Sequence, residues 1–335
     1  MRAVSLTAPG GLDRLHVVDL LEPGAPGPGE VVVRVHASSL NFHDYGLAAG
    51  KMPAADGRIL LSDAGGVVEA VGDGVTEFAP GDAVVSVFFP QWMDGPASVS
   101  DFSLTPGDGR DGYACERVVR PVASFTHAPR NWTHAEAATL TTAGLTAWRA
   151  LVVDGGLKAG DSVLVLGTGG VSLFAMQFAQ AMGATVIATS SSDEKLERLR
   201  GLGAAFALNY RSHPDWGRRI FDWTGGRGVD HVVEVGGPGT LNQSIEAVRV
   251  GGHISLIGVL TGFGGEVSTV ALMVKQARLQ GLVVGSRRHQ TDMIRALDAT
   301  GIRPVLDRSF PLDELADAFR YEETGRHFGK ISIAV

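Results

Sequence analysis

A single cysteine, Cys115, stands among the 335 residues of the chain. One thiol cannot close an internal disulfide. It also cannot build a cysteine-based structural zinc site, which needs about four nitrogen or sulfur ligands. So little cysteine is typical of a reducing compartment, and we therefore expect a cytoplasmic protein without disulfides.

Positive charge is scarce as well. Lysine and arginine number 29 against 36 aspartate and glutamate residues, which gives a formal net charge of −7. No basic block offsets this balance, so we expect no nucleic-acid partner. The N-terminal stretch MRAVSLTAPGG has no long apolar core and therefore does not predict a secretory signal.

Charge is absent altogether between Asp161 and Asp193, a stretch long enough to cross a bilayer. Three glycines, Gly167, Gly169 and Gly170, interrupt this stretch, and glutamines lie in its helical part. Both parts are typical of a strand and a helix buried in an α/β core. We therefore expect no membrane span.

The same stretch carries the most specific motif of the chain. The apolar run 163–166 ends in the sequence GTGG, and a helix-like segment follows. In a dinucleotide fold the first glycine of such a motif permits a tight turn, and the second lets backbone approach a pyrophosphate. The helix that follows presents free N–H groups to the phosphates. The third motif position is Ser172 instead of glycine. The predicted cofactor-binding residues here are Gly167, Gly169, Gly170 and Val171.

The two halves of the chain differ in periodicity. Residues 1–127 are β-rich, with turn signals between short strands and a long loop at 90–112. From residue 128 on, strand-like and helix-like segments alternate, which is typical of a parallel, doubly wound sheet. The strands predicted there are 163–166, 185–189, 206–208, 230–234, 252–257, 280–284 and 330–335. The predicted helices are 133–153, 170–182, 193–201, 214–223, 240–248, 291–299 and 312–321.

Several short motifs span nearly the whole chain: SLNFHDY at 39–45, AGGVVE at 64–69, PGDAV at 80–84, LTTAGLTA at 140–147, GTGGV at 167–171, DEKL at 193–196 and GK at 329–330. In this order they resemble the medium-chain dehydrogenase/reductase superfamily, and within it the zinc-independent, quinone-oxidoreductase-like branch. The resemblance implies an α/β fold with a doubly wound parallel Rossmann sheet inserted in a GroES-like β domain. The implied domains are a GroES-like catalytic domain of residues 1–127, completed by 301–335, and a Rossmann dinucleotide-binding domain of residues 128–300.

The resemblance also bears on metal. Zinc-dependent relatives bind their catalytic metal through cysteine and histidine, and the matching positions here are Asn41, Ser62 and Thr142. Asp63 matches the acidic residue that follows the histidine. Amide and hydroxyl side chains are poor zinc ligands beside thiolate and imidazole, so we expect no metal.

The cofactor is predicted from the end of the strand at 185–189. An NAD-type fold usually places Asp or Glu there, which accepts hydrogen bonds from the ribose hydroxyls. The resemblance places Ser190 at this position, where a 2′-phosphate meets no repelling carboxylate. We therefore expect NADP(H), with a phosphate site made of Ser190, Ser191, Lys195, Tyr210 and Arg211. The alternative is that the serines only cap the following helix, and both roles can hold together.

Further cofactor contacts follow from the resemblance and from strand ends. Thr146 is implied to lie beside the nicotinamide, and its alternative is a helix-interior threonine. Lys330 is predicted to reach a cofactor phosphate, with a solvent-exposed lysine as the alternative. The residues expected at the carboxyl edge of the sheet are Gly236, Gly258, Val259 and Leu260.

Asn41, His43 and Tyr45 are the candidate catalytic residues. When a quinone or an α,β-unsaturated carbonyl compound is reduced, conjugation carries the developing charge to an oxygen, so an enzyme supplies mainly position and hydrogen-bond donors. Asn41 is predicted as an amide donor, His43 as a proton donor near neutral pH, and Tyr45 as a second donor. The alternatives are turn hydrogen bonding, a structural histidine and a cleft wall, respectively. An apolar substrate wall is predicted from Phe88, Phe89, Trp92 and Phe102, with ordinary loop packing as its alternative.

These observations predict an NADPH-dependent, zinc-independent oxidoreductase that transfers hydride to a quinone or an α,β-unsaturated carbonyl compound. Two alternatives stay open. One is an NADP-dependent alcohol dehydrogenase or ketone reductase without zinc, and the other is a non-catalytic NADPH-binding protein. Apart from a small-molecule substrate, the expected partner is a second copy of the chain. The resemblance implies a homodimer in which residues 280–284 pair across a two-fold axis.

Overall fold

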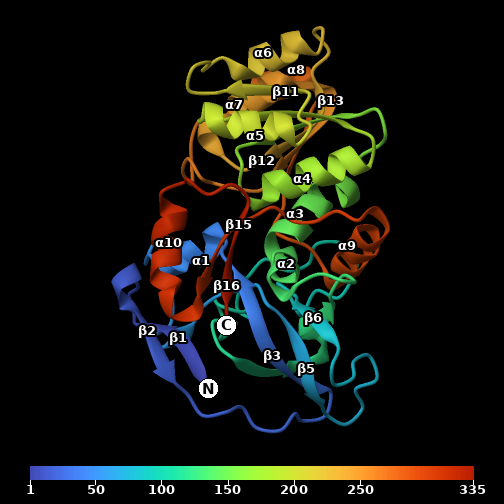
Figure 1. Ribbon diagram of the computed structural model, residues 1–335. Helices are drawn as coiled ribbons and strands as arrows, with labels where there is room; N and C mark the ends of the chain where they lie inside the picture. Colours follow the sequence, from blue (N-terminus) through green and yellow to red (C-terminus); the bar gives the residue numbers. More distant parts are fainter. The chain divides into compact units, whose positions relative to one another are not determined.

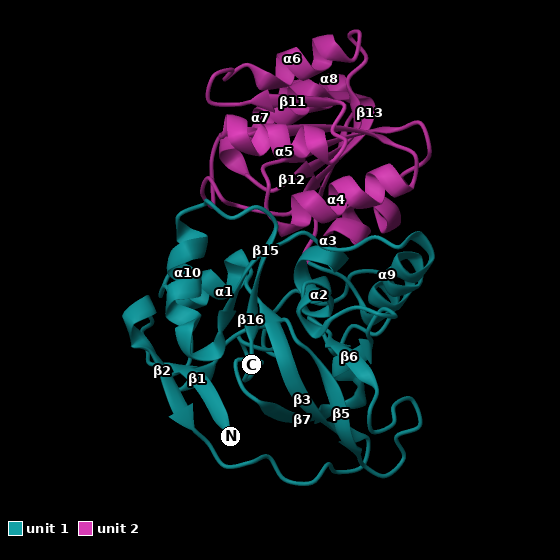
Figure 2. Cartoon of the chain, viewed as in Figure 1, with its two compact units in different colours: residues 1–145, 284–335 teal, residues 146–283 magenta.

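The computed structural model describes residues 1–335, which form two compact units. Unit 1 contains Met1–Leu145 and Val284–Val335, and unit 2 contains Thr146–Val283 (Figure 2). The elements of both units are labelled in Figure 1. No helix is long and apolar enough to span a membrane.

Unit 2 is built around a six-stranded sheet in which all neighbouring strands are parallel, in the order β11-β10-β9-β12-β13-β14. Its strands are β9 (Ser162–Leu166), β10 (Thr185–Ser190), β11 (Phe206–Asn209), β12 (Val229–Glu234), β13 (Val248–Leu256) and β14 (Arg278–Gly281). This order is that of a doubly wound dinucleotide-binding sheet, whose ligand lies at the carboxyl ends where the order reverses. Here the reversal lies between β9 and β12.

The helices of unit 2 follow the strands in alternation. They are α4 (Gly170–Ala181), α5 (Asp193–Gly201), α6 (Trp216–Trp223), α7 (Pro238–Ala247) and α8 (Thr269–Lys275). The inner strands are largely buried on both faces, as in a covered parallel sheet, and β12 is buried along its whole length, including the side chains of Asp230, His231 and Glu234. Leu164 and Val232 of the sheet share one core with Ile220 of α6 and Ile245 of α7.

Unit 1 holds a seven-stranded sheet and a separate three-stranded one. The large sheet has the order β15-β16-β3-β5-β6-β8, and β7 also pairs with β3. Its strands are β3 (Glu30–Ser39), β5 (Gly65–Val71), β6 (Ala83–Ser86), β7 (Arg117–Pro121), β8 (Phe125–His127), β15 (Leu306–Pro311) and β16 (Lys330–Ala334). The small sheet contains β1 (Arg2–Leu6), β2 (Leu15–Asp19) and β4 (Arg58–Ile59). Because β16 lies between β15 and β3, the C-terminal segment completes this unit.

The helices of unit 1 are α1 (Phe42–Ala48), α2 (His134–Ala138), α9 (Arg287–Thr300) and α10 (Leu315–Glu323). The predicted helix 133–153 is divided into α2, a π-helical turn (Leu140–Gly144), α3 (Leu145–Trp148) and a second π-helical turn (Arg149–Val153). Such turns in a helix are often found at functional sites. The first turn carries Thr142 into the site described below.

The unit boundaries differ from the predicted domain boundaries. Residues 128–145 and 284–300 belong to unit 1 instead of the Rossmann part. The physical reason is packing: α2 packs against β3, β5 and β6, and Gln290 of α9 donates to the Ser86 carbonyl (2.9 Å) and to Thr126 Oγ1 (2.8 Å). These contacts join residues far apart in sequence, so helical periodicity could not reveal them. The predicted strand 280–284 is also displaced, to 278–281.

Candidate active site and dinucleotide-binding site

The glycine motif of unit 2 forms the turn predicted from the sequence. Gly167 has a φ of 74°, in the left-handed region that favours glycine, and its N–H donates to the Thr189 carbonyl (2.9 Å). Helix α4 begins three residues later, at Gly170. Ser172 Oγ donates to the Leu166 carbonyl (2.7 Å) and ties this helix to the end of β9. A hydroxyl bond therefore provides the close helix–strand contact for which the motif usually uses a third glycine.

The space beside this turn fits a phosphate group. A Cβ added to Gly169 would meet no atom within 4 Å, so an incoming group can approach the backbone there. No side chain caps the N-terminus of α4, which leaves its first N–H groups available to an anion. The open space and the uncapped N–H groups fit the predicted pyrophosphate contact of Gly167, Gly169, Gly170 and Val171, which stays a prediction.

At the end of β10, the strand that follows the glycine motif, the chain places the hydroxyl groups of a serine run, and the nearby Asp193 carboxylate accepts from Nδ2 of Asn209 (2.7 Å), the residue opposite Ser190. Ser190 is buried and its Oγ accepts from the Ser192 N–H (3.2 Å), while Ser192 Oγ accepts from the Lys195 N–H (3.3 Å) as the N-cap of α5. Tyr210 lies next to this strand end, with its N–H on the Ser190 carbonyl (3.1 Å) and a side chain that is 40% exposed. Of the serine run, Ser192 therefore caps helix α5, as the alternative predicted. The cofactor roles of Ser190, Ser191, Lys195 and Tyr210 stay predictions.

The turns after β12 and β13 lie side by side at the same edge of the sheet. A Cβ on Gly258 would lie 2.2 Å from the Val235 carbonyl oxygen, so only glycine fits this close approach. The Thr261 N–H donates to the Gly236 carbonyl (2.9 Å) and joins the two turns. Val259 and Leu260 are 36% and 54% exposed beyond this point. The predicted residues Gly236, Gly258, Val259 and Leu260 therefore gather at one edge.

Glu234 is a residue of this edge that the sequence analysis did not single out. Its fully buried carboxylate accepts from the N–H groups of Gly236 (2.7 Å) and Gly237 (3.0 Å) and from Thr240 Oγ1 (2.6 Å). It also accepts from Ser244 Oγ. The acidic residue at the end of the predicted strand 230–234 was the available signal. Thr146, predicted beside the nicotinamide, is buried on α3.

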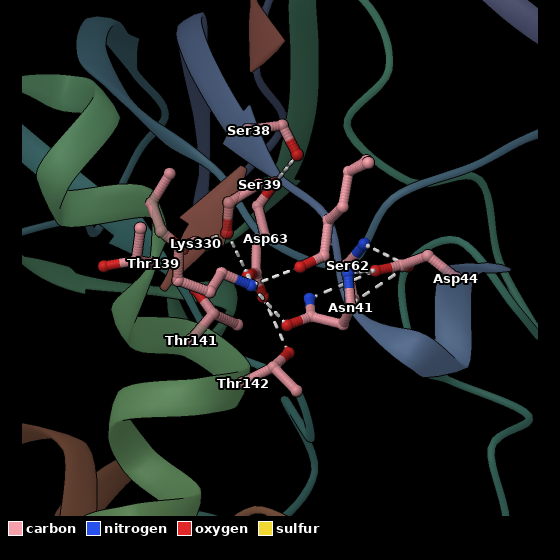
Figure 3. Close-up of polar contacts among 12 residues, drawn as sticks. Ser38, Ser39, Asn41, Asp44, Ser62, Asp63, Thr139, Thr141, Thr142 and Lys330 are labelled. Atoms are coloured by element: carbon pink, nitrogen blue, oxygen red, sulfur yellow. Dashed lines mark hydrogen bonds and ion pairs between the residues drawn. The ribbon is translucent and has the colours of Figure 1, made fainter. Parts of the chain in front are cut away.

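Unit 1 contains a buried set of polar side chains, which we call the polar cluster (Figure 3). Its members are Ser39, Asn41, Asp44, Ser62, Asp63, Thr142 and Lys330. It includes all the positions that match the zinc ligands of zinc-dependent relatives. Strand β3 and the start of α1, the segment between β4 and β5, the first π-helical turn and β16 bring these residues together.

Asp63 accepts hydrogen bonds from three parts of the cluster. This fully buried carboxylate accepts from Thr142 Oγ1 (2.7 Å) through Oδ1 and from Ser39 Oγ (2.5 Å) through Oδ2. The Lys330 ammonium lies 3.5 Å from the same Oδ2. Charge-assisted bonds of this kind are what make a buried carboxylate tolerable.

Asp44 holds the start of α1. Its Oδ2 accepts from both the backbone N–H and the side-chain Nδ2 of Asn41, each at 3.1 Å, and its Oδ1 accepts from the Ser62 N–H (3.1 Å). Burial, together with the charge of Asp63, raises the pKa of Asp44 to about 6. Asn41 takes part in the predicted turn hydrogen bonding through both its backbone N–H and its side chain, and the side chain has a further partner in Lys330.

Lys330 is the member that the sequence analysis assigned differently. Its ammonium donates to Asn41 Oδ1 (2.6 Å) and to the Leu40 carbonyl, and its third neighbour is Asp63. The side chain is 4% exposed. Every hydrogen of the ammonium is directed at an acceptor inside unit 1, and the contact of Lys330 with a cofactor phosphate stays a prediction. The solvent-exposed alternative does not agree with this arrangement.

His43 has a carboxylate partner from the long loop at 90–112. Its Nε2 lies 3.0 Å from Asp108 Oδ2, and both side chains are about one-fifth exposed, at 18% and 20%. The imidazole stacks on Phe102, with 4.9 Å between ring centroids, and meets the edge of Phe88. A carboxylate that fixes an imidazole in this way is typical of histidines that move protons. No pattern in the sequence predicts Asp108 as this partner, because 65 residues separate it from His43.

Tyr45 and most of the aromatic side chains are placed less favourably for catalysis. The Tyr45 hydroxyl donates to Glu323 Oε1 (2.7 Å) and accepts from Lys51 (3.0 Å), and burial together with Glu323 raises its pKa. Phe88, Phe89 and Trp92 are at most 2% exposed, so they are packed inside the loop as ordinary core. Of the predicted apolar wall, only Phe102 is partly exposed.

The residues at the zinc-ligand positions do not fit a zinc ion. No group of three or more His, Cys, Asp or Glu side chains is placed to hold a metal. Asn41 and Thr142 offer only neutral oxygens or nitrogens, and their carbonyl and hydroxyl groups are already engaged by Lys330 and Asp63. A positively charged ammonium stands among these groups, and it would repel a cation.

Family models match both units. A model described as alcohol dehydrogenase GroES-like domain matches residues 27–130, and one described as zinc-binding dehydrogenase matches residues 170–299. A zinc-type alcohol dehydrogenase-like protein of Schizosaccharomyces pombe is 39% identical over 97% of this chain and 96% of its own length. The chain belongs to the medium-chain dehydrogenase/reductase superfamily.

Solved structures of this superfamily are similar over the whole chain. An NAD-dependent alcohol dehydrogenase is 37% identical with a TM-score of 0.90, and the match covers 100% of both chains. A quinone oxidoreductase of Pseudomonas syringae is 29% identical with a TM-score of 0.83, over 100% and 99% of the two chains. The crotonyl-CoA carboxylase/reductase AntE, solved with NADP, is 26% identical with a TM-score of 0.89, over 100% and 94%.

These similarities confirm the predicted fold, in which a Rossmann sheet is inserted in a GroES-like domain. They also identify the protein as an NAD(P)H-dependent oxidoreductase. The alternative of a non-catalytic nucleotide-binding protein is therefore set aside.

Proposed function

We propose that this oxidoreductase is an NADPH-dependent, zinc-independent reductase of quinones or α,β-unsaturated carbonyl compounds. The observation that carries the proposal is the polar cluster, which offers an amide donor, Asn41, at a position where zinc-dependent relatives have a metal ligand. Hydrogen-bond donors stabilise a developing oxyanion less strongly than a metal ion does. A conjugated substrate suits such a site because conjugation spreads the charge that develops in the transition state.

Bound NADPH would supply the hydride, and the residues of this chain supply the rest. Asn41 Nδ2 has one N–H on Asp44 and a second one that can meet a substrate oxygen. His43, held by Asp108, is the proposed proton donor. Two of the solved relatives support this substrate class, since one is a quinone oxidoreductase and the other a crotonyl-CoA carboxylase/reductase.

The preference for NADPH is supported by the end of β10, where Ser190 stands in place of an acidic residue. AntE was solved with NADP, which agrees with this preference, whereas the more similar alcohol dehydrogenase is NAD-dependent. The chemistry of the strand end decides our choice, because a 2′-phosphate would meet no carboxylate at Ser190.

A homodimer and a cytoplasmic location complete the proposal. Strand β14 is an edge strand, and α8 exposes Val270, Met273 and Val274, each 65–68% accessible. An unpaired edge beside apolar side chains favours pairing with a second copy, which a molar mass from light scattering would test. The proposal of a cytoplasmic location rests on the single cysteine, Cys115, because so little cysteine is typical of a reducing compartment. Burial raises the pKa of its thiol to about 12.

A second candidate function is an alcohol dehydrogenase or ketone reductase without zinc. The His43–Asp108 pair favours it, because a saturated ketone needs a proton donor. Oxidation of NADPH and of NADH should be measured against quinones, enones, aldehydes and ketones. We expect turnover of quinones or enones with NADPH. Turnover of ketones and aldehydes alone would establish the second candidate and refute the first.

A further inference from the structure

We propose that Lys330 is an internal cation of the polar cluster, that it occupies the place of the metal ion in zinc-dependent relatives, and that it fixes the orientation of the Asn41 amide. This inference rests on the proposed function for the role of Asn41, but not for the position of the ammonium. Figure 3 shows the Lys330 side chain reaching from β16 toward Asn41 and Asp63.

The position of the ammonium is the first argument. Lys330 Nζ contacts Asn41 Oδ1 and Asp63 Oδ2 directly. Thr142 is one step away through Asp63 Oδ1, and Ser62 is connected through Asp44 and Asn41. The ammonium thus contacts one of the three matching positions directly, reaches Thr142 through the Asp63 carboxylate, and is connected to Ser62 through Asn41 and Asp44.

The backbone around Lys330 directs the side chain to this place. Gly329 has a φ of 96°, and a Cβ there would lie 2.2 Å from the Val305 carbonyl oxygen, so only glycine fits. Lys330 then begins β16, which pairs antiparallel with β3 so that Ser332 lies opposite Ser39. The Gly329-Lys330 motif is therefore explained by this geometry without any contact to a cofactor.

Charge balance is the second argument. Asp44 and Asp63 are at most 1% exposed, and the half-buried Glu322 lies close enough for its pKa to respond to both Lys330 and Asp44. Burial raises the pKa of Glu322 to about 7. Buried carboxylates without a nearby cation are costly, and Lys330 is the cation that the cluster provides.

The orientation of Asn41 follows from these charges. Its Oδ1 accepts from the ammonium and its Nδ2 donates to the Asp44 carboxylate. A flip of the amide would turn the NH2 group toward an ammonium and the carbonyl oxygen toward a carboxylate, which both partners oppose. Lys330 is thus a positioning residue: it keeps the second N–H of Nδ2 available as a donor.

The experiment uses Lys330→Met and Lys330→Ala in the full-length protein, with kcat, KM and the NADPH dissociation constant measured for each. We expect kcat to fall about 10²-fold, the usual scale for loss of an oxyanion donor, while the NADPH constant changes less than twofold. The double variant Asn41→Ala Lys330→Met should be no slower than Asn41→Ala alone, because both changes remove the same donor. Additive losses in this double variant would overturn the positioning role.

Chemical rescue tests the position of the charge independently of turnover. Methylammonium chloride should raise both Tm and kcat of Lys330→Ala in a saturable way, compared with sodium chloride at the same ionic strength. Lys275→Ala is the matched control, because Lys275 is also partly buried and donates to the carbonyls of Glu246 and Val248. The Lys275 ammonium donates only to backbone carbonyls and belongs to no cluster of buried carboxylates, so we expect no rescue.

The outcomes separate this inference from the proposed function. If the wild type reduces no quinone, enone or ketone, the proposed function fails, and the Tm of Lys330→Ala with methylammonium still decides whether the cluster holds a cation. No rise in that Tm would overturn the inference, as would near wild-type kcat in a folded Lys330→Met variant.

Discussion

The two units build their candidate sites from different materials. Unit 2 uses backbone: the turn at Gly167–Gly170 and the paired turns around Gly236 and Gly258 leave N–H groups and open space for a ligand. Unit 1 uses side chains, and its decisive contact joins Asn41 to Lys330 across 289 residues of sequence. The comparison teaches that a site made of local backbone can be recognised from a motif, whereas a site made of distant side chains needs the fold.

The largest expected effect tests the backbone site. Gly169→Asp places a carboxylate in the open space where a pyrophosphate would lie, and like charges in contact cost several kcal/mol. We expect the NADPH dissociation constant to rise about 100-fold or more, measured by fluorescence titration. Gly169→Ala is the control, because its Cβ would meet no atom within 4 Å. Equal binding by the Asp variant and the wild type would mean that the cofactor does not use this turn.

The next effect tests the side-chain site. His43→Ala should lower kcat about 10²-fold, the usual scale for general acid catalysis, while the NADPH dissociation constant hardly changes. Ketones should be affected more than quinones, since a reduced quinone oxygen can take its proton from water. Asp108→Asn should give a smaller fall in the same direction. Asp101→Asn is the control, since Asp101 lies on the same loop but bonds only Ser103. A folded His43→Ala variant with normal kcat on every substrate would make His43 structural.

A third prediction concerns cofactor choice in unit 2. Ser190→Asp would place a carboxylate beside the 2′-phosphate and weaken NADPH relative to NADH by about 1–3 kcal/mol. Dissociation constants for both cofactors check this. Tighter binding of NADH by the wild type would contradict our interpretation of the serine run.

A fourth prediction compares how pH changes the stability of the two units. In unit 2, burial lowers the pKa of His253 to about 4, and Arg278 Nε donates to its Nδ1 (2.6 Å), which requires the neutral ring. The folded pKa lies below the ordinary value of 6.5, so this contribution to stability is present above pH 6.5 and is lost as the pH falls toward 4. Between pH 6.5 and 4.5 the loss should be about 2 kcal/mol. His253→Asn keeps an acceptor for Arg278 without titrating.

Urea unfolding of wild type and His253→Asn at several pH values measures this difference. In unit 1, the titration of Asp44 changes the free energy of unfolding in the opposite direction. The pKa of Asp44 is raised to about 6, so its contribution is present below the ordinary carboxyl range and is lost as the pH rises through 6. A variant with the same loss of stability on acidification as the wild type would show that His253 is not the responsible group.

The smallest expected effect is no effect at all. The purified protein should contain far less than one zinc per chain, and a chelator should leave kcat unchanged, because an ammonium stands where a metal would need ligands. Metal analysis by mass spectrometry measures the content. Stoichiometric zinc that is lost together with activity would contradict both the proposed function and the internal cation.

The division between local and distant information also explains which expectations agreed with the structure. The Rossmann strands and helices lie within a few residues of their predicted bounds, because hydrophobic periodicity and glycine signals are local. Asn41 and His43 were singled out through a motif, but their contacts with Lys330 and Asp108 were not predicted, since side-chain contacts between segments far apart in the sequence leave no local pattern. Helix α1 was missed because it is short and follows a β-rich stretch, and α8 because most of its apolar residues face outward.

Strand β16 has a consequence for biogenesis. It lies between β15 and β3, so unit 1 has a gap in its sheet until Lys330–Ala334 have left the ribosome. All of unit 2 is synthesised before that moment. Its parallel sheet can form while β3 still lacks its neighbour β16. The nascent chain would therefore acquire its nucleotide-binding half first. Asp63 and Asp44 would meet the Lys330 ammonium only after β16 has been synthesised, so the polar cluster forms when β16 pairs with β3.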